Sequence, residues 1–150
     1  MAEQLFFRDI IYTNRSSEQM QREAGELMRK LGIAGLEDRK ITEVSGGQLQ
    51  RACICRALMN HPAIIYADEP TGALNRKASR EVMEEFVKLN REGTSILMVT
   101  HDSKVAEMCD KVLYLVDGRI EGSLELGKYR PQDASLRGER MKKWLDSKEA

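Results

Sequence analysis

The apolar positions in the first part of the chain follow the period of a helix. Residues 15–31 are strongly charged, and one apolar stripe runs through them at Met20, Ala24, Leu27, Met28 and Leu31. This spacing predicts a surface helix. After a link containing two glycines, a second striped segment predicts a helix from about residue 47 to residue 60, ended by His61 and Pro62. The first 60 residues are therefore expected to be helical.

The pattern then changes to short, continuous apolar runs. "AIIYA" (63–67) and "SILMVT" (95–100) are rich in β-branched and other apolar residues, and residues 76–91 between them return to helical spacing. Runs of this kind are typical of strands buried on both faces, as in a parallel sheet. The pattern predicts a strand-helix-strand unit.

The last third of the chain carries a hairpin signal and a polar tail. A short helix is expected from about residue 103 to residue 109. In "KVLYLVDGRI", Asp117-Gly118 lies between two apolar runs, which predicts a hairpin that gives the sheet an antiparallel edge. The tail from Pro131 onward is polar with a weak apolar stripe, and it predicts a loosely attached helix.

Composition restricts the function classes. With 150 residues and 41% hydrophobic content, one globular domain is expected. Lys+Arg and Asp+Glu both count 24, so no overall field draws the chain to nucleic acid or an anionic membrane. No apolar run approaches the roughly 20 residues of a membrane helix, and the start lacks an export signal. The 3 cysteines form no disulfide framework and indicate a reducing compartment, the cytoplasm.

Acidic residues and a histidine follow the two predicted strands. Asp68 and Glu69 end the first strand, and His101 follows the second. In a parallel unit both strands end at the same edge, where ligands bind. Because consecutive strand residues point in opposite directions, one acid can hold Mg²⁺ through water while the other activates a water molecule, and the histidine can sense a terminal phosphate. Taken singly, each is more often an ordinary surface or packing residue.

The stretch "VSGGQLQR" (44–51) allows two readings. Ser45 and Gln48 have the spacing of a capping box, which is an ordinary helix start. The pair Gly46-Gly47 leaves the backbone amides at the positive end of the helix open to a phosphate. A cap alone needs no double glycine, and this favours a phosphate-binding turn.

Four stretches together resemble the ATP-binding cassette (ABC) ATPases. "VSGGQLQR" resembles the family's signature motif, "IIYADEP" its Walker B strand, "TGALN" its D-loop and "VTHD" its switch-histidine segment. The resemblance implies an α/β fold of the P-loop NTPase type: a partial ABC nucleotide-binding domain with a helical subdomain and part of the parallel catalytic sheet. It divides the chain into a helical subdomain with the signature (1–60), catalytic-core elements (61–125) and a C-terminal tail (126–150).

The resemblance also implies a role for each motif residue. The signature residues are Ser45, Gly46, Gly47 and Gln48, and they would meet the γ-phosphate of ATP held by another subunit. Asp68 would position Mg²⁺ through water, Glu69 would be the general base, and His101 would be the γ-phosphate switch. The D-loop residues are Ala73, Leu74 and Asn75, and the family usually has Asp where this chain has Asn75.

The resemblance starts beyond the family's Walker A loop and Q-loop. "GSLELGKY" (122–129) matches the spacing GxxxxGK, but Tyr129 replaces the Ser or Thr that binds Mg²⁺, and Pro131 interrupts the helix that should follow. We therefore do not expect it to bind phosphate. Cys53 and Cys55 are expected to point to different faces of a helix, which disfavours a metal site.

These features predict an ATP-binding and ATP-hydrolysing subunit of a bacterial ABC exporter, with ATP and Mg²⁺ as cofactors. "DEPTGALN" resembles the subgroup that serves macrolide, antimicrobial-peptide and lipoprotein exporters. The implied partners are a second ABC ATPase subunit and a membrane permease, which would hold the chain at the inner face of the membrane without insertion. The 150-residue chain alone is expected to be catalytically deficient, since nothing in it replaces the Walker A lysine. The unpaired strand at 63–67 predicts self-association.

Two alternatives remain at this stage. The chain could be a non-enzymatic module that docks on a full-length ABC ATPase and regulates it by offering its signature helix. It could also be a half-domain like those of chromosome-maintenance and DNA-repair ABC ATPases. The zero net charge and the lack of a heptad-repeat arm count against the second alternative.

Overall fold

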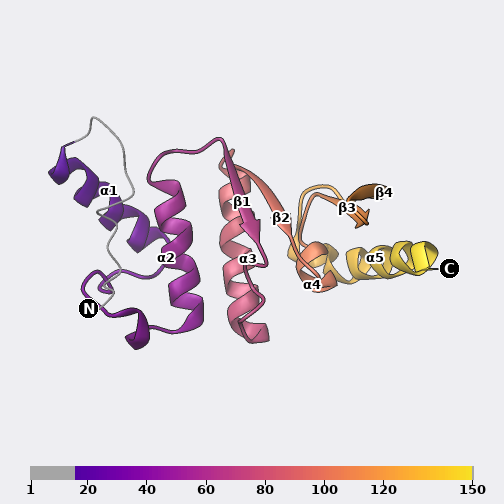
Figure 1. The fold of residues 1–150 in the computed structure, drawn as a ribbon, viewed down its shortest axis with the longest axis horizontal. Helices are drawn as coiled ribbons and strands as arrows, with labels where there is room; N and C mark the ends of the chain where they lie inside the picture. Colours follow the sequence, from indigo (N-terminus) through magenta and orange to yellow (C-terminus); the bar gives the residue numbers. More distant parts are fainter. Residues whose placement is uncertain (1–15, 150) are drawn as a thin grey trace. The chain divides into compact units, whose positions relative to one another are not determined.

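The structure is a computed structural model that describes residues 16–149 (Figure 1). The chain forms two units, of which the first ends at Met98 and the second begins at Val99. The predictions that concern residues 1–15 lie outside the described residues.

The helices of the first unit begin at polar caps. Helix α1 spans Ser17–Lys30 and α2 spans Gly46–Leu58, and a Ser-x-x-Gln capping box starts each of them. Both predicted helices are confirmed. A single 3-10 turn, η2 (Ile41–Glu43), lies in the link between them. Helix α1 contacts α2, and α2 contacts α3 (Arg76–Arg91). Apolar side chains of these three helices and of the residues that follow α1 and α2 form most of this unit's core, with the largest fully buried ones at Met28, Leu31, Ile33, Met59, Val82 and Cys55.

The predicted strand-helix-strand unit is also confirmed. Strand β1 (Ile64–Asp68) leads through α3 to β2 (Ser95–Val99), and the two strands are hydrogen-bonded neighbours. In Figure 1 both arrows run in the same direction, with α3 alongside them. The carboxyl ends of β1 and β2 therefore lie at the same edge, as the parallel arrangement requires.

The prediction that both strands are buried on both faces is wrong. Ile65 of β1 is 6% exposed, whereas its neighbour Tyr66 is 73% exposed and Leu97 of β2 is 50% exposed. Alternate strand residues point to opposite faces, so one face of this sheet is covered and the other is open among the described residues. The expected self-association rests on an unpaired edge of the strand at 63–67, and it stays a prediction.

The second unit begins with a short helix and a hairpin. Helix α4 spans only Ser103–Ala106, which is shorter than predicted. Strands β3 (Lys111–Val116) and β4 (Arg119–Glu125) pair in antiparallel register around Asp117-Gly118, whose φ values of 47° and 75° suit a two-residue hairpin turn. The hairpin is confirmed. It forms a two-stranded sheet of its own, so the expected antiparallel edge of the first sheet is wrong.

The C-terminal tail is firmly attached within the second unit. A 3-10 turn, η3 (Pro131–Asp133), leads into α5 (Ala134–Glu149). Arg137 of α5 is 3% exposed, and the Trp144 ring meets Tyr114 of β3 edge-on, with ring centroids 6.1 Å apart. The prediction of a loosely attached helix is wrong because a charged residue and an aromatic residue of α5, not an apolar stripe, anchor it.

Candidate functional site

The turn at Ser45 is held by two reciprocal hydrogen bonds. The Ser45 amide donates to Oε1 of Gln48 at 2.9 Å, and the Gln48 amide donates to Oγ of Ser45 at 3.2 Å. This is the predicted capping box, and it orients both side chains at the start of α2.

The two glycines of this turn face the start of α3. A Cβ atom built on Gly46 would lie 3.0 Å from Cδ2 of Leu74, and one built on Gly47 would lie 3.3 Å from Cβ of Ala78. Both distances are shorter than an ordinary carbon–carbon contact. The inference that a double glycine here favours a ligand was therefore incomplete, since close packing of α2 on α3 also requires small residues.

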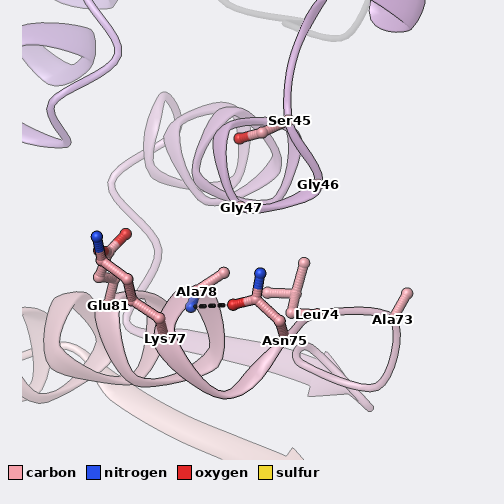
Figure 2. Close-up of a pocket in the computed structure, with 9 residues that line it drawn as sticks. All are labelled: Ser45, Gly46, Gly47, Ala73, Leu74, Asn75, Lys77, Ala78 and Glu81. Carbon is pink, nitrogen blue, oxygen red and sulfur yellow. Dashed lines mark hydrogen bonds between the residues drawn. The ribbon is translucent and has the colours of Figure 1, made fainter.

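A cavity of about 280 Å³ opens between the start of α2 and the start of α3 (Figure 2). Its walls are formed by Ser45, Gly46, Gly47, Ala73, Leu74, Asn75, Lys77, Ala78 and Glu81. The first unit thus brings three predicted signature residues and all three predicted D-loop residues into one pocket. Asn75 caps α3, because its Oδ1 accepts a hydrogen bond from the Ala78 amide at 2.9 Å.

Lys77 and Glu81 are pocket residues that the sequence reasoning missed. They lie one helical turn apart near the start of α3, and Figure 2 shows both on the α3 side of the cavity. Nη2 of Arg51 in α2 lies 3.8 Å from Oε2 of Glu81, and this ion pair links the two helices. Their spacing was visible in the sequence, but only the packing of α2 on α3 reveals that they face the signature turn.

The two predicted catalytic acids follow β1 directly. The strand ends at the exposed Asp68, and Glu69 lies beyond it with a left-handed φ of 43°. The prediction of two consecutive strand residues is therefore wrong. Asp68 is the last residue of the strand, and the turn sets the direction of the Glu69 side chain. The Glu69 carbonyl accepts from the Gly72 amide at 3.1 Å, and the next residues, Pro70 and Thr71, are buried. A non-glycine residue held in this region is strained, and such strain often accompanies a functional site.

His101 belongs to the second unit. It is exposed and precedes Asp102, whose Oδ1 accepts from the Lys104 amide at 2.8 Å and caps α4. The cavity at α2 and α3 belongs to the first unit, so His101 is not among the residues that line it.

The family was settled by comparison with known proteins. The protein-family model described as "ABC transporter" matches residues 1–72. The macrolide export ATP-binding/permease protein MacB of Mannheimia succiniciproducens is 46% identical over 110 residues, which are 73% of this chain and 17% of MacB. A solved dimeric structure of the ATP-binding cassette MJ0796, bound to ADP and Pi, is 36% identical and superposes with a TM-score of 0.66. This chain belongs to the ABC ATPase family.

The family assignment confirms the predicted fold class, a partial P-loop NTPase domain of the ABC type. The ABC transporter ATP-binding protein YknY of Bacillus subtilis, described as uncharacterized, is 41% identical over 111 residues. The match covers 74% of this chain and 48% of YknY, and the MJ0796 match covers 79% of this chain and 52% of that structure. The chain thus covers about half of YknY and of the MJ0796 cassette, and a much smaller part of MacB.

The GxxxxGK-like stretch does not have the form of an ABC phosphate loop. Gly122 lies inside strand β4, and Nζ of Lys128 is 2.5 Å from Oδ2 of Asp110. The next α-helix begins only at Ala134. A phosphate loop needs a flexible glycine-rich turn that leads directly into a helix, so the prediction that this stretch does not bind phosphate is supported.

Two further features of this ABC chain concern Mg²⁺ and membranes. Within residues 16–149, no three His, Cys, Asp or Glu side chains cluster as a metal site. Asp68 alone still fits Mg²⁺, which keeps several waters and is held by one or two carboxylates together with substrate phosphates. No helix in the same range is long and apolar enough to cross a bilayer.

Proposed function

We propose that this chain contributes the signature side of an ATP site that a second ABC subunit completes. Ser45, Gly46, Gly47 and Gln48 would meet the γ-phosphate of ATP held by the other subunit's Walker A loop. The observation that carries the proposal is the pocket in which the signature turn and the D-loop residues meet. The dimeric, ADP-bound state named for MJ0796 supports a site of this kind.

The chain's own acids and histidine would act on the phosphate side of a nucleotide. Asp68 would hold Mg²⁺ through water, and the ion would supply positive charge that neutralises the phosphates. Glu69 orients and deprotonates the attacking water, and His101 contacts the γ-phosphate. In the D-loop, Ala73, Leu74 and Asn75 meet the partner subunit, and the amide of Asn75 supplies a weaker contact than an aspartate. The strained backbone at Glu69 supports its assignment as the general base.

The relatives' names indicate the biological setting. MacB is named a macrolide export ATP-binding/permease protein, so we propose a bacterial exporter in which a permease binds this chain at the inner face of the membrane. Within that assembly, residues 1–60 form the helical subdomain, 61–125 the catalytic core and 126–150 the tail.

The 150-residue polypeptide alone should turn over no ATP. Its sequence contains no GxxxxGK followed by Ser or Thr, and the one near match runs through a strand. Without the lysine and amides of such a loop, the β- and γ-phosphates have no holder in the chain.

A complementation assay tests the proposal. The chain is mixed with a full-length ABC cassette whose own signature serine is changed to Arg, so that its ATP site depends on a signature supplied by this chain. Phosphate release should rise on mixing, and Ser45→Arg in this chain should abolish the rise. Ser16→Arg is the matched control, because Ser16 caps α1 with the same capping box but lies outside the pocket. No rise, or a rise that survives Ser45→Arg, would contradict the proposal.

The second candidate is a regulatory module that never hydrolyses ATP. The pocket at α2 and α3 favours it, since the signature and D-loop residues that line this pocket all lie in the first unit. Glu69→Gln separates the two candidates when a Walker A segment is supplied to this chain. Loss of turnover supports the hydrolysing subunit, and unchanged turnover supports the module.

A further inference from the structure

Arg137 in α5 donates hydrogen bonds to an unusual number of backbone carbonyls. Its Nε donates to the Glu107 carbonyl at 2.7 Å, and its Nη2 donates to the Cys109 carbonyl at 2.7 Å. Its Nη1 donates to the Leu126 and Gly127 carbonyls, both at 3.0 Å. The side chain is therefore buried without an unpaired nitrogen. Burial lowers the pKa of the Arg137 guanidinium, and the carboxylate of Asp110 opposes this shift.

Two of these carbonyls belong to the segment that ends α4. Glu107 is the C-cap of this helix, and Cys109 follows shortly after it. A helix of four residues is too short to be stable alone, and the last carbonyls of any helix have no partner within it. The guanidinium supplies that partner, and its charge is favourable at a helix C-terminus.

The other end of α4 adjoins His101. The Asp102 amide donates to Oγ1 of Thr100 at 3.0 Å, and the Asp102 side chain caps α4. Val105, in the middle of the helix, is 3% exposed. Residues 100–109 are thus one hydrogen-bonded segment, with the histidine at its start and two carbonyls bound by Arg137 at its end.

We propose that Arg137 is a positioning residue for His101. Through α4 it fixes the backbone from which the imidazole projects, so the C-terminal helix determines where the histidine points. The importance of this for turnover rests on the role of His101 proposed above, but the coupling itself does not.

Lysine could not do the same work. The planar guanidinium presents five N–H donors from three nitrogens, and all three nitrogens are bonded here. A lysine has one nitrogen with three donors, so it cannot reach the α4 carbonyls and the carbonyls after β4 together. Arg137→Lys should keep part of the effect and Arg137→Met none.

The matched control is Arg140→Met. Arg140 lies on the same helix, and its Nη2 donates to the Glu125 carbonyl at 2.7 Å. Losing this bond loosens α5 on the hairpin without removing either bond to the α4 segment. The only tryptophan, Trp144, reports whether α5 stays docked, through its fluorescence beside Tyr114.

The experiment is long-range ¹H–¹⁵N spectroscopy of the imidazoles in the intact chain. The sequence contains 2 histidines, so His61 in the first unit is the internal reference. Arg137→Met should shift or broaden the His101 signals and leave those of His61 unchanged. Arg137→Lys should show a smaller change, and Arg140→Met should leave His101 as in the wild type.

Unchanged His101 signals in Arg137→Met, or an equal change in Arg140→Met, would overturn the proposal. If Arg137→Met does not fold, the comparison of Arg137→Lys with Arg140→Met decides in the same way. Because the spectrum reads the imidazole directly, a failed complementation assay would count against the proposed function and not against this coupling.

Discussion

Helices α1 and α2 begin with the same cap and differ in the two residues that follow it. Ser16 and Gln19 form a capping box with bonds of 3.1 and 3.2 Å, and Ser45 and Gln48 form one with bonds of 2.9 and 3.2 Å. Between them α1 has Ser-Glu and α2 has Gly-Gly. The cap therefore explains how α2 starts but does not explain its glycines.

The difference lies in what each helix start touches. Ser17 and Glu18 are exposed, whereas Gly46 and Gly47 lie against Leu74 and Ala78. In α2 the absence of side chains brings the signature turn close to the D-loop, and the cavity opens beside that contact. One sequence feature, the double glycine, thus has a packing role as well as the ligand role that the family resemblance implies.

The largest expected effect comes from filling this contact. Gly47→Val adds a branched side chain where a Cβ alone would lie 3.3 Å from Ala78, so it should lower the free energy of unfolding of the first unit by about 1–3 kcal/mol. Glu18→Val is the equivalent position in α1 and should change it by less than about 0.5 kcal/mol. Urea unfolding monitored by circular dichroism measures both. Equal effects would show that the glycine makes no close contact.

Alkaline pH tests whether α2 is buried along its length as well as at its start. Cys55 is fully buried, and burial raises the pKa of its thiol to about 12. The thiol therefore has a higher pKa in the folded chain than the 9.0 of the unfolded chain. Below pH 9 the thiol is neutral in both states and stability is unaffected, whereas between pH 9 and 12 it ionises only in the unfolded state, which lowers the free energy of unfolding. At pH 10 the loss should be about 1.4 kcal/mol.

Two cysteine variants isolate that contribution. Cys55→Ala should flatten the fall in unfolding free energy between pH 8 and pH 10, measured by urea titration at each pH. Cys53→Ala should keep the fall, because Cys53 is exposed on the same helix. A pH dependence that is the same in both variants would assign the loss to other groups.

The smallest expected effect is that of Gly46→Ala. The nearest atom to the added Cβ is Cδ2 of Leu74, the end of a flexible side chain that can move. The strain of this contact destabilises the folded chain, and the lower conformational entropy of the unfolded chain has the opposite effect. The two should nearly cancel, so the free energy of unfolding should change by no more than about 0.5 kcal/mol.

A double-mutant cycle reveals the hidden contact. With Leu74→Ala in place, Gly46→Ala should stabilise the first unit by about 0.4–1 kcal/mol, since only the gain remains. Ser17→Ala, at the equivalent position of α1, should change the free energy of unfolding by the same amount with and without Leu74→Ala. A Gly46→Ala effect that does not depend on residue 74 would contradict the packing described here.

Local signals account for what the sequence predicted well. The capping residues Ser16 and Ser45, the period of α3 and the Asp117-Gly118 turn each act within a few residues of the chain, so each can be recognised without the fold. The family motifs likewise lie in continuous stretches. The pocket residues Lys77 and Glu81 carry no such signal, because only the packing of two helices brings them to the signature turn.

The wrong predictions share a different cause. An apolar strand such as β1 has the same sequence whether its second face is covered or open, so the exposure of Tyr66 could not be read from it. The tail appeared loosely attached because Arg137 is normally a surface residue, and its burial depends on carbonyls from two other segments. Interactions made by the backbone leave no pattern in the sequence of side chains.

The left-handed backbone at Glu69 has an evolutionary consequence. A non-glycine residue in this conformation costs roughly 1–2 kcal/mol, which a glycine would avoid. Stability alone therefore favours losing the glutamate, and the role of general base proposed above would be the reason that selection keeps its carboxylate. If Glu69 is the general base proposed above, position 69 should drift to glycine or asparagine early in lineages that lose ATP hydrolysis, and the residue found there would record that loss.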